Sequence, residues 1–429
     1  MKMIKLDEKT RNNILDDLLK RSPSSYSEYE QTVNDIINDV RNNKDEAIFR
    51  YTLKFDGYEL NSGNIKVTED EFEEAFKAVD EKVIEVIKHS AENIRRFHEK
   101  QLRNTWIETD ENGSILGQRI TPIACSGVYV PGGKAAYPSS VLMNIIPAKV
   151  AGVKRIIMTT PPGKDGRVSP GTLVAARIAG ADEVYKVGGA QAIAAMAFGT
   201  QSIPKVDKIT GPGNIFVALA KKACFGFVSI DSIAGPSEIL VLADETANPR
   251  YVAADLLSQA EHDEMASAIL ITTSQSLAER VSVEIDGFVP KLDRKDIISK
   301  SLDNYGYILI AEDMDDAVET ANAIASEHVE ILTQNPFEVM TRVKNAGAIF
   351  LGEYSSEPLG DYFAGPNHIL PTNGTARFFS PLSVDDFIKK TSIINYSKQG
   401  LLKVHSEIER FAQYEGLTAH ANSIAVRFE

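Results

Sequence analysis

The pattern of apolar and polar positions divides the chain into segments of different character. Between about 120 and 355, short runs rich in β-branched residues predict strands, and alanine-rich stretches with apolar residues every three or four positions predict helices between them. This alternation is typical of α/β layers with largely parallel sheets, and so many strands indicate two sheets rather than one. The predicted strands are GVYVP, RIIMTT, EVYKVGG, KITGPG, EILVLAD, AILITT, YILIAE, HVEILT and AIFLGE. The predicted helices begin near Ser139, Pro170, Ala190, Asn214, Asn248, Asp313 and Pro336.

The two ends of the chain have helical patterns instead. Within 68–100, apolar residues recur at helical spacing, and Thr68 followed by Glu71 predicts a capping box at the start of one long amphipathic helix. Near the other end, SVDDFIKKTSIINYSK and KVHSEIERFAQYEG are both expected to be helical. We therefore predict an α/β protein with two parallel-sheet, Rossmann-like domains and helical N-terminal and C-terminal extensions. The expected divisions are a helical segment (1–25), a first α/β domain (26–128 plus 239–380), a second α/β domain (129–238) and a helical tail (381–429).

Composition narrows the class of protein. The 429 residues are 43% hydrophobic and 25% charged, which is ordinary for a globular protein and excludes disorder or a fibre. Lys and Arg number 46 against 60 Asp and Glu, a net charge of -14, so no nucleic-acid partner is expected. The start of the chain has no signal-peptide pattern and no apolar run is long enough to cross a bilayer, so we expect a cytoplasmic protein without a membrane partner. Two cysteines allow no disulfide framework.

Glycine-rich loops follow several of the predicted strands: VPGGKAAYPSS, VGGAQAIAA, TGPGN and AGPSE. Glycine lets a backbone approach a ligand closely, and the N-terminus of a following helix offers free N–H groups to a phosphate. The dinucleotide fingerprint GxGxxG is incomplete, however, because Phe216 stands where the third glycine belongs. Tight turns of an α/β fold explain these loops as well as a bound nucleotide does. Ligands of such sheets are expected at the carboxyl ends of strands.

Imidazole, amide and carboxylate groups recur in four short segments of the second half of the chain. In the predicted helix 248–264, Gln259 and His262 are three residues apart and share a face. Glu327 and His328 join a predicted helix to a strand, where such a pair is able to transfer protons in sequence. These donors, without thiolates, suit Zn²⁺ or Mn²⁺, although no standard zinc motif occurs. The other two segments contain Asp361 with His368, and Glu415 with His420.

The segment IDSIAGPSEILVLADETANPRYVAADLLSQAEH, 230–262, closely resembles the signature of histidinol dehydrogenases. The resemblance continues through YVPGG, GGAQAIAA-AFGT, TGPGN, SEHVEI, GPNH-LPT-GTARF and LSVDDF, and so covers the chain from about 125 to its end. It implies an enzyme of histidine biosynthesis that oxidises L-histidinol to L-histidine through L-histidinaldehyde. It also implies NAD and one Zn²⁺ per subunit as cofactors, and a homodimer whose tails contribute to each other's sites.

The same resemblance implies a role for individual residues. Glu327 and His328 would be the proton-transfer pair. The expected metal ligands are Gln259, His262, Asp361 and His420. The expected substrate contacts are Ser237, Gln259, His262, His328, Asp361, His368, Glu415 and His420. The expected NAD contacts, in the second α/β domain, are Tyr129, Gln191 and Asn214.

Three other functions remain open on the residues alone. An aldehyde dehydrogenase would use a thiohemiacetal on Cys125 or Cys224, although a buried apolar role is the expected one for each cysteine. A zinc metallohydrolase would use Glu327 and a zinc-activated water on an ester or amide. An acidic α/β binding protein would use the glycine loops only to hold a nucleotide.

Overall fold

The computed structural model describes residues 1–19, 21, 27–132 and 137–429. It contains two compact units: Met1–Gln101 with Ala124–Phe387, and Leu102–Ile123 with Ile388–Glu429. The predicted division at 25/26 and part of the VPGGKAAYPSS loop lie outside the described residues. The remaining domain boundaries stay a prediction.

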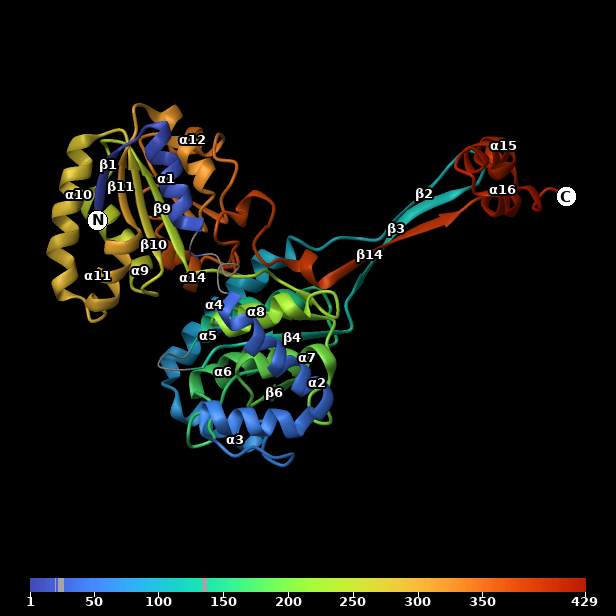
Figure 1. Ribbon diagram of the computed structural model, residues 1–429, viewed down its shortest axis with the longest axis horizontal. Helices are drawn as coiled ribbons and strands as arrows, with labels where there is room; N and C mark the ends of the chain where they lie inside the picture. Colours follow the sequence, from blue (N-terminus) through green and yellow to red (C-terminus); the bar gives the residue numbers. More distant parts are fainter. Residues whose placement is uncertain (20, 22–26, 133–136) are drawn as a thin grey trace. The chain divides into compact units, whose positions relative to one another are not determined.

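A six-stranded parallel sheet forms one half of the first unit, with the order β1-β11-β10-β9-β12-β13 (Figure 1). Every residue of the central strands β9, β10 and β12 is buried, and most are apolar, because helices cover both faces. Leu240 and Leu242 face α1, α12 and α13, whereas their neighbours Ile239 and Val241 face α9, α10 and α11. The strands are β1 (Lys2–Lys5), β9 (Glu238–Ala243), β10 (Ser267–Thr272), β11 (Gly306–Ile310), β12 (His328–Leu332) and β13 (Ala348–Leu351). The helices are α1 (Glu8–Leu19), α9 (Pro249–Ala260), α10 (Gln275–Phe288), η2 (Val289–Lys291), α11 (Lys295–Tyr305), α12 (Met314–Ile324), α13 (Pro336–Met340), α14 (Glu357–Tyr362), η3 (Thr375–Arg377) and η4 (Val384–Phe387).

A five-stranded parallel sheet, β6-β5-β4-β7-β8, forms the other half of this unit. Counted from its first strand, its order is the 3-2-1-4-5 of nucleotide-binding sheets, and β9 to β13 repeat that order in the larger sheet. The expected pair of Rossmann-like sheets is therefore confirmed. The strands are β4 (Cys125–Tyr129), β5 (Arg155–Thr159), β6 (Glu183–Tyr185), β7 (Lys208–Thr210) and β8 (Ser229–Ile230). The helices between them are α5 (Pro138–Val150), α6 (Pro170–Ala179), α7 (Gly189–Phe198) and α8 (Ile215–Cys224).

Three N-terminal helices, α2 (Ser27–Asp56), α3 (Glu69–Ala78) and α4 (Glu81–Glu99), pack on the five-stranded half. The expected grouping was 26–128 with 239–380. An amphipathic pattern shows which face of a helix is buried, but it does not show which element covers that face. The single helix expected over 68–100 is wrong: the chain breaks at Val79–Asp80, and Asp80 caps a new helix. The predicted capping box of Thr68 and Glu71 is confirmed.

The second unit is an antiparallel sheet of order β14-β3-β2 followed by two helices (Figure 1). Its elements are β2 (Trp106–Thr109), β3 (Ile115–Pro122), β14 (Ile388–Asn395), α15 (Lys398–Tyr414) and α16 (Thr418–Ala425). The expected helix over 383–398 is wrong: half of it is β14, because IKKTSIIN is rich in β-branched residues and pairs along its full length with β3. The expected helix over KVHSEIERFAQYEG is confirmed within α15. Among the described residues, no helix combines the length and apolar character needed to cross a membrane.

Candidate active site

The polar residues singled out from the second half of the chain gather at the amino ends of strands in the six-stranded sheet. Ser237 directly precedes β9. Glu327 directly precedes β12, whose first residue, His328, pairs with Ile239. Helices α9 and α12 run back along the sheet and therefore end at this edge, where α9 delivers Gln259 and α12 leads into Glu327. The expectation of a site at carboxyl ends is wrong for this sheet.

The pair Glu327 and His328 is buried and tied to one neighbour, Glu238. The backbone N–H of Glu238 donates to Glu327 Oε2 at 2.9 Å, and the backbone carbonyl of Glu238 lies 2.9 Å from His328 Nδ1. Because a carbonyl oxygen only accepts, Nδ1 carries the proton and Nε2 is left as the basic nitrogen. Burial lowers the pKa of His328 to about 4, so its imidazole is neutral near pH 7. Burial, with the nearby carboxylates of Glu238 and Asp361, raises the pKa of Glu327 well above its usual value.

A second group of side chains offers donors for a metal ion. One ligand atom each from His262, Glu357 and Asp361 lie within 4.8 Å of one another. Glu357 and Asp361 are four residues apart on α14, so both face the same side of it. Gln259 is completely buried, and neither atom of its amide has a hydrogen-bond partner among the described residues. A buried amide without a partner is costly unless a ligand satisfies it, so these residues fit a bound cation.

Glu357 is the member of this group that sequence reasoning missed. Its signal was its position four residues before Asp361 in a helix that begins after Ser356. Ser258 Oγ donates to Glu357 Oε2 at 3.3 Å, and Glu330 Oε1 accepts from the backbone N–H of Glu357 at 2.7 Å. Burial and the charge of Asp361 raise the pKa of Glu357 to about 9.

The loop that contains His368 lies beside Asp361, and residues of α5 in the five-stranded half hydrogen-bond to it. His368 Nδ1 lies 3.3 Å from Asp361 Oδ1, and His368 Nε2 lies 3.4 Å from Ser140 Oγ on α5. Asn367 Nδ2 donates to the carbonyl of Met143 at 2.7 Å. Burial opposes the ionisation of Asp361, but the hydrogen bond with His368 and the charges of surrounding imidazoles outweigh burial and lower the pKa of Asp361 to about 2.

The three residues expected to contact NAD belong to the five-stranded half, two of them at its switch point. Tyr129 ends β4 and Asn214 follows the neighbouring β7, where the strand order reverses. The N–H of Gly189 donates to the Tyr129 hydroxyl at 3.2 Å, and the buried Gln191 Oε1 has no partner among the described residues. Asn214 Oδ1 accepts from the first turn of α8, a capping role that sequence reasoning did not predict.

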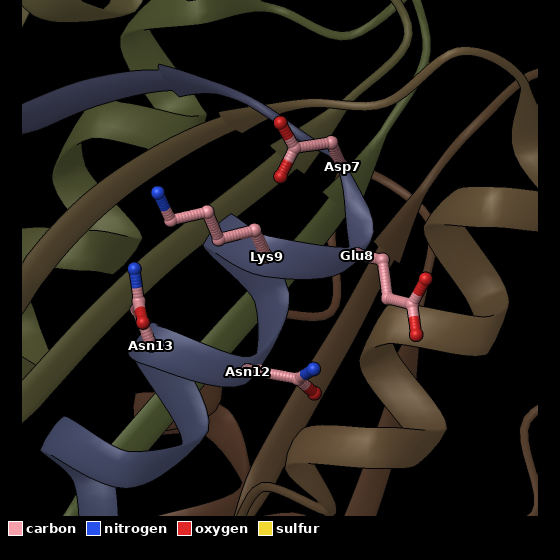
Figure 2. A pocket seen from close by; sticks show the side chains of 5 residues that line it. All are labelled: Asp7, Glu8, Lys9, Asn12 and Asn13. Carbon is pink, nitrogen blue, oxygen red and sulfur yellow. The ribbon is translucent and has the colours of Figure 1, made fainter.

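The remaining predicted site residues lie elsewhere. Glu415 is the C-cap residue that follows α15 and His420 lies in α16, and both are exposed in the second unit. Burial raises the pKa of Cys125 to about 11 and that of Cys224 to about 12, which disfavours a thiolate nucleophile. A pocket at the start of α1 holds no predicted site residue, and Figure 2 shows its side chains pointing apart.

Two nucleotide-type parallel sheets, a buried acid–imidazole pair and an adjoining cation-compatible group define the class of this protein as an α/β enzyme. The family model for histidinol dehydrogenase matches residues 19–428. The chain is 57% identical over 412 residues to a histidinol dehydrogenase of Clostridium acetobutylicum, covering 96% of this chain and 95% of that one. It is 57% identical over 410 residues to that of Bacillus subtilis, covering 95% and 96%.

A solved structure agrees with the sequence comparisons. The crystal structure of histidinol dehydrogenase from Elizabethkingia anophelis superposes with a TM-score of 0.94 at 39% identity, covering 100% of this chain and 98% of that one. The chain therefore belongs to the histidinol dehydrogenase family, as its ordered motifs indicated.

Proposed function

We propose that this chain catalyses the NAD-dependent, four-electron oxidation of L-histidinol to L-histidine through L-histidinaldehyde. The observation that carries the proposal is the buried pair of Glu327 and His328, which stands beside a cation-compatible group in a chain of the histidinol dehydrogenase family. Family membership alone names the substrate. The pair supplies one base for the carbinol proton and a second base for the proton of the water that hydrates the aldehyde.

The metal of this proposal is one Zn²⁺ per subunit, held by Gln259, His262 and Asp361 of one chain and by His420 of a second copy. Oxygen and imidazole donors of this kind suit zinc. When bound, zinc supplies a Lewis acid that fixes the imidazole and amine of histidinol. Glu357 lies among the same donors and beside Asp361. It would therefore either orient Asp361 through a hydrogen bond or be a further metal ligand.

The proton transfers follow from the positions of the two bases. His328 Nε2 is unprotonated because Nδ1–H is committed to the Glu238 carbonyl, so Nε2 takes the carbinol proton as hydride leaves. Glu327 then accepts a proton from the water that hydrates the aldehyde. Burial raises the pKa of Glu327 well above its usual value, and a cation bound nearby would act in the opposite direction by favouring the carboxylate.

NAD⁺, when bound, would supply the hydride acceptor for each of the two oxidations. Tyr129, Gln191 and Asn214 are the residues we assign to it, at the end of the five-stranded sheet where nucleotides bind in folds of this order. Two features of the described residues support this placement: Gln191 Oε1 has no hydrogen-bond partner among them, and none of their side chains caps the N-terminus of α7. Ser237 and His368 are assigned to the substrate.

The second unit is assigned to a homodimer in which each tail completes the partner's site. Glu415 and His420 are exposed, and exposed apolar side chains accompany them on α15 and the turn that follows. An exposed apolar surface of this kind marks a contact with another protein. The exposed apolar residues are Leu402, Ile408, Phe411, Tyr414 and Leu417. Cytoplasmic location stays a prediction.

The test combines a metal analysis with a histidinol assay. Purified protein should contain zinc and should form NADH from NAD⁺ and L-histidinol. His262→Asn should lose most of its bound zinc and its activity, whereas His89→Asn, an exposed histidine on α4, should keep both. Full zinc content in His262→Asn would refute ligation by His262. A wild-type protein that forms no NADH with histidinol would refute the function.

A further inference from the structure

Glu238 is the common neighbour of both proton-transfer residues. It begins β9 and is 3% exposed. Its N–H and its carbonyl bind Glu327 and His328 as described above, and its carboxylate Oε2 also accepts from the backbone N–H of Glu327 at 3.3 Å. The backbone N–H of Asn373 donates to the same carboxylate. The position of Glu238 therefore sets the positions of both bases.

The carboxylate of Glu238 has a buried counter-ion in the N-terminal segment. Arg21 is completely buried, and its Nη2 forms an ion pair with Glu238 Oε1. Its Nη1 donates to the carbonyl of Met265 at 2.9 Å, and its guanidinium lies 5.2 Å from the ring centre of Tyr305. Arg21 thus ties Glu238 to the approach to β10, the strand beside β9.

A carboxylate at this depth is costly without a compensating charge. Removal of Arg21 would leave Glu238 either charged and unpaired or protonated. In the first state the buried charge would be uncompensated, and in the second the neutral carboxyl group would be a weaker acceptor for the Glu327 and Asn373 N–H groups. In both, the start of β9 would lose its link to Met265. A catalytic base displaced by about 1 Å loses on the order of 100-fold in rate.

We propose that Arg21 is a positioning residue of the active site, through which the N-terminal segment holds Glu238 and thereby the pair Glu327 and His328. This inference rests on the proposed function, because its readout is turnover. The side chain of Arg21 contacts Glu238, Met265 and Tyr305, none of which we assign to histidinol, zinc or NAD. It is expected to affect kcat rather than the KM for histidinol.

The test compares two arginines of the same N-terminal segment. Arg11 on α1 also bridges to the six-stranded half, where it pairs with Asp316 and Glu319 on α12, away from the bases. Arg21→Met should lower kcat on the order of 10- to 100-fold, with histidinol KM within about 2-fold and zinc content unchanged. Arg11→Met should keep kcat within about 2-fold. Equal kcat in the two variants would overturn the proposal.

A charge-balanced variant separates positioning from folding. Arg21→Met/Glu238→Gln removes both charges but keeps an oxygen for the Glu327 N–H, so it should recover about 10-fold in kcat over Arg21→Met. No recovery would overturn the proposal. If Arg21→Met does not fold, Arg21→Lys decides: a lowered kcat at unchanged KM supports the proposal, and a kcat equal to that of Arg11→Met overturns it. An inactive wild type refutes the proposed function as well, whereas an active wild type with an unaffected Arg21→Met refutes only this inference.

Discussion

The buried ion pair of Lys221 and Asp231 gives a stability prediction with a matched control, because the adjacent Lys222 forms an exposed ion pair. The two side chains are 3% and 4% exposed. Both also bind the backbone of Gly211 in the TGPGN loop: Lys221 Nζ donates to its carbonyl at 3.0 Å, and Asp231 Oδ2 accepts from its N–H at 2.7 Å. A side chain at Gly211 would meet the Tyr129 carbonyl, so the pair holds this loop in close contact with β4.

Lys221→Met keeps most of the apolar stem but leaves the Asp231 carboxylate buried and unpaired. Breaking a buried pair in this way costs about 3–5 kcal/mol of unfolding free energy. Lys222 pairs with Glu30 at 2.9 Å, but both side chains are 42% exposed, so Lys222→Met should cost only about 0–1 kcal/mol. The same substitution at adjacent positions of α8 is thus expected to differ by at least about 2 kcal/mol.

Urea unfolding followed by far-UV circular dichroism measures this difference. Fluorescence is the wrong probe, because the single tryptophan, Trp106, belongs to the second unit. Lys221→Met should also raise the KM for NAD⁺, since Gly211 lies in the loop before Asn214. Equal destabilisation by the two variants would refute the reasoning, and so would a Lys221→Met protein of wild-type stability.

Three further predictions test other parts of the molecule. Glu327→Gln should lower kcat by about 10²–10⁴-fold while histidinol still binds, and wild-type turnover would contradict its role as a base. Cys125→Ala should keep kcat within a factor of about three, because burial raises the pKa of that thiol to about 11; a loss of several orders of magnitude would restore the thiohemiacetal mechanism. Burial raises the pKa of Asp56 to about 6, so the folded state retains a proton that the unfolded chain has lost, and stability falls as pH rises between about 4 and 6. Asp56→Asn should remove that fall and add about 1–3 kcal/mol at pH 8, and an unchanged pH slope in urea titrations would refute the assignment.

The local pattern predicted the elements of the two α/β halves well. All nine expected strands are present, and the expected helices begin within a residue or so of their predicted starts. These elements depend on short-range periodicity, which the sequence shows directly. Strand β14 was missed because its partner β3 lies far away in the sequence, and the break at Val79 because the apolar spacing continues across it.

Several of the residues predicted for the site lie together, but at the other ends of the strands from those expected. The residues Glu327, His328, His262 and Asp361 lie close together, but at the amino ends of the strands. This is because most of them lie at or after the ends of helices, which run antiparallel to the strands and so end at that edge of the sheet. Glu357 and Arg21 were missed for a different reason. Their roles depend on contacts with residues distant in the sequence, and the local sequence pattern does not show such contacts.

The number of NADH molecules formed per histidinol tests the central claim most directly. With limiting L-histidinol and excess NAD⁺, the chain should form two NADH for each L-histidinol and release L-histidine, because one site performs both oxidations. One NADH per histidinol with accumulating aldehyde would contradict the second oxidation and the role of Glu327 in hydration. No NADH would contradict the proposed function as a whole.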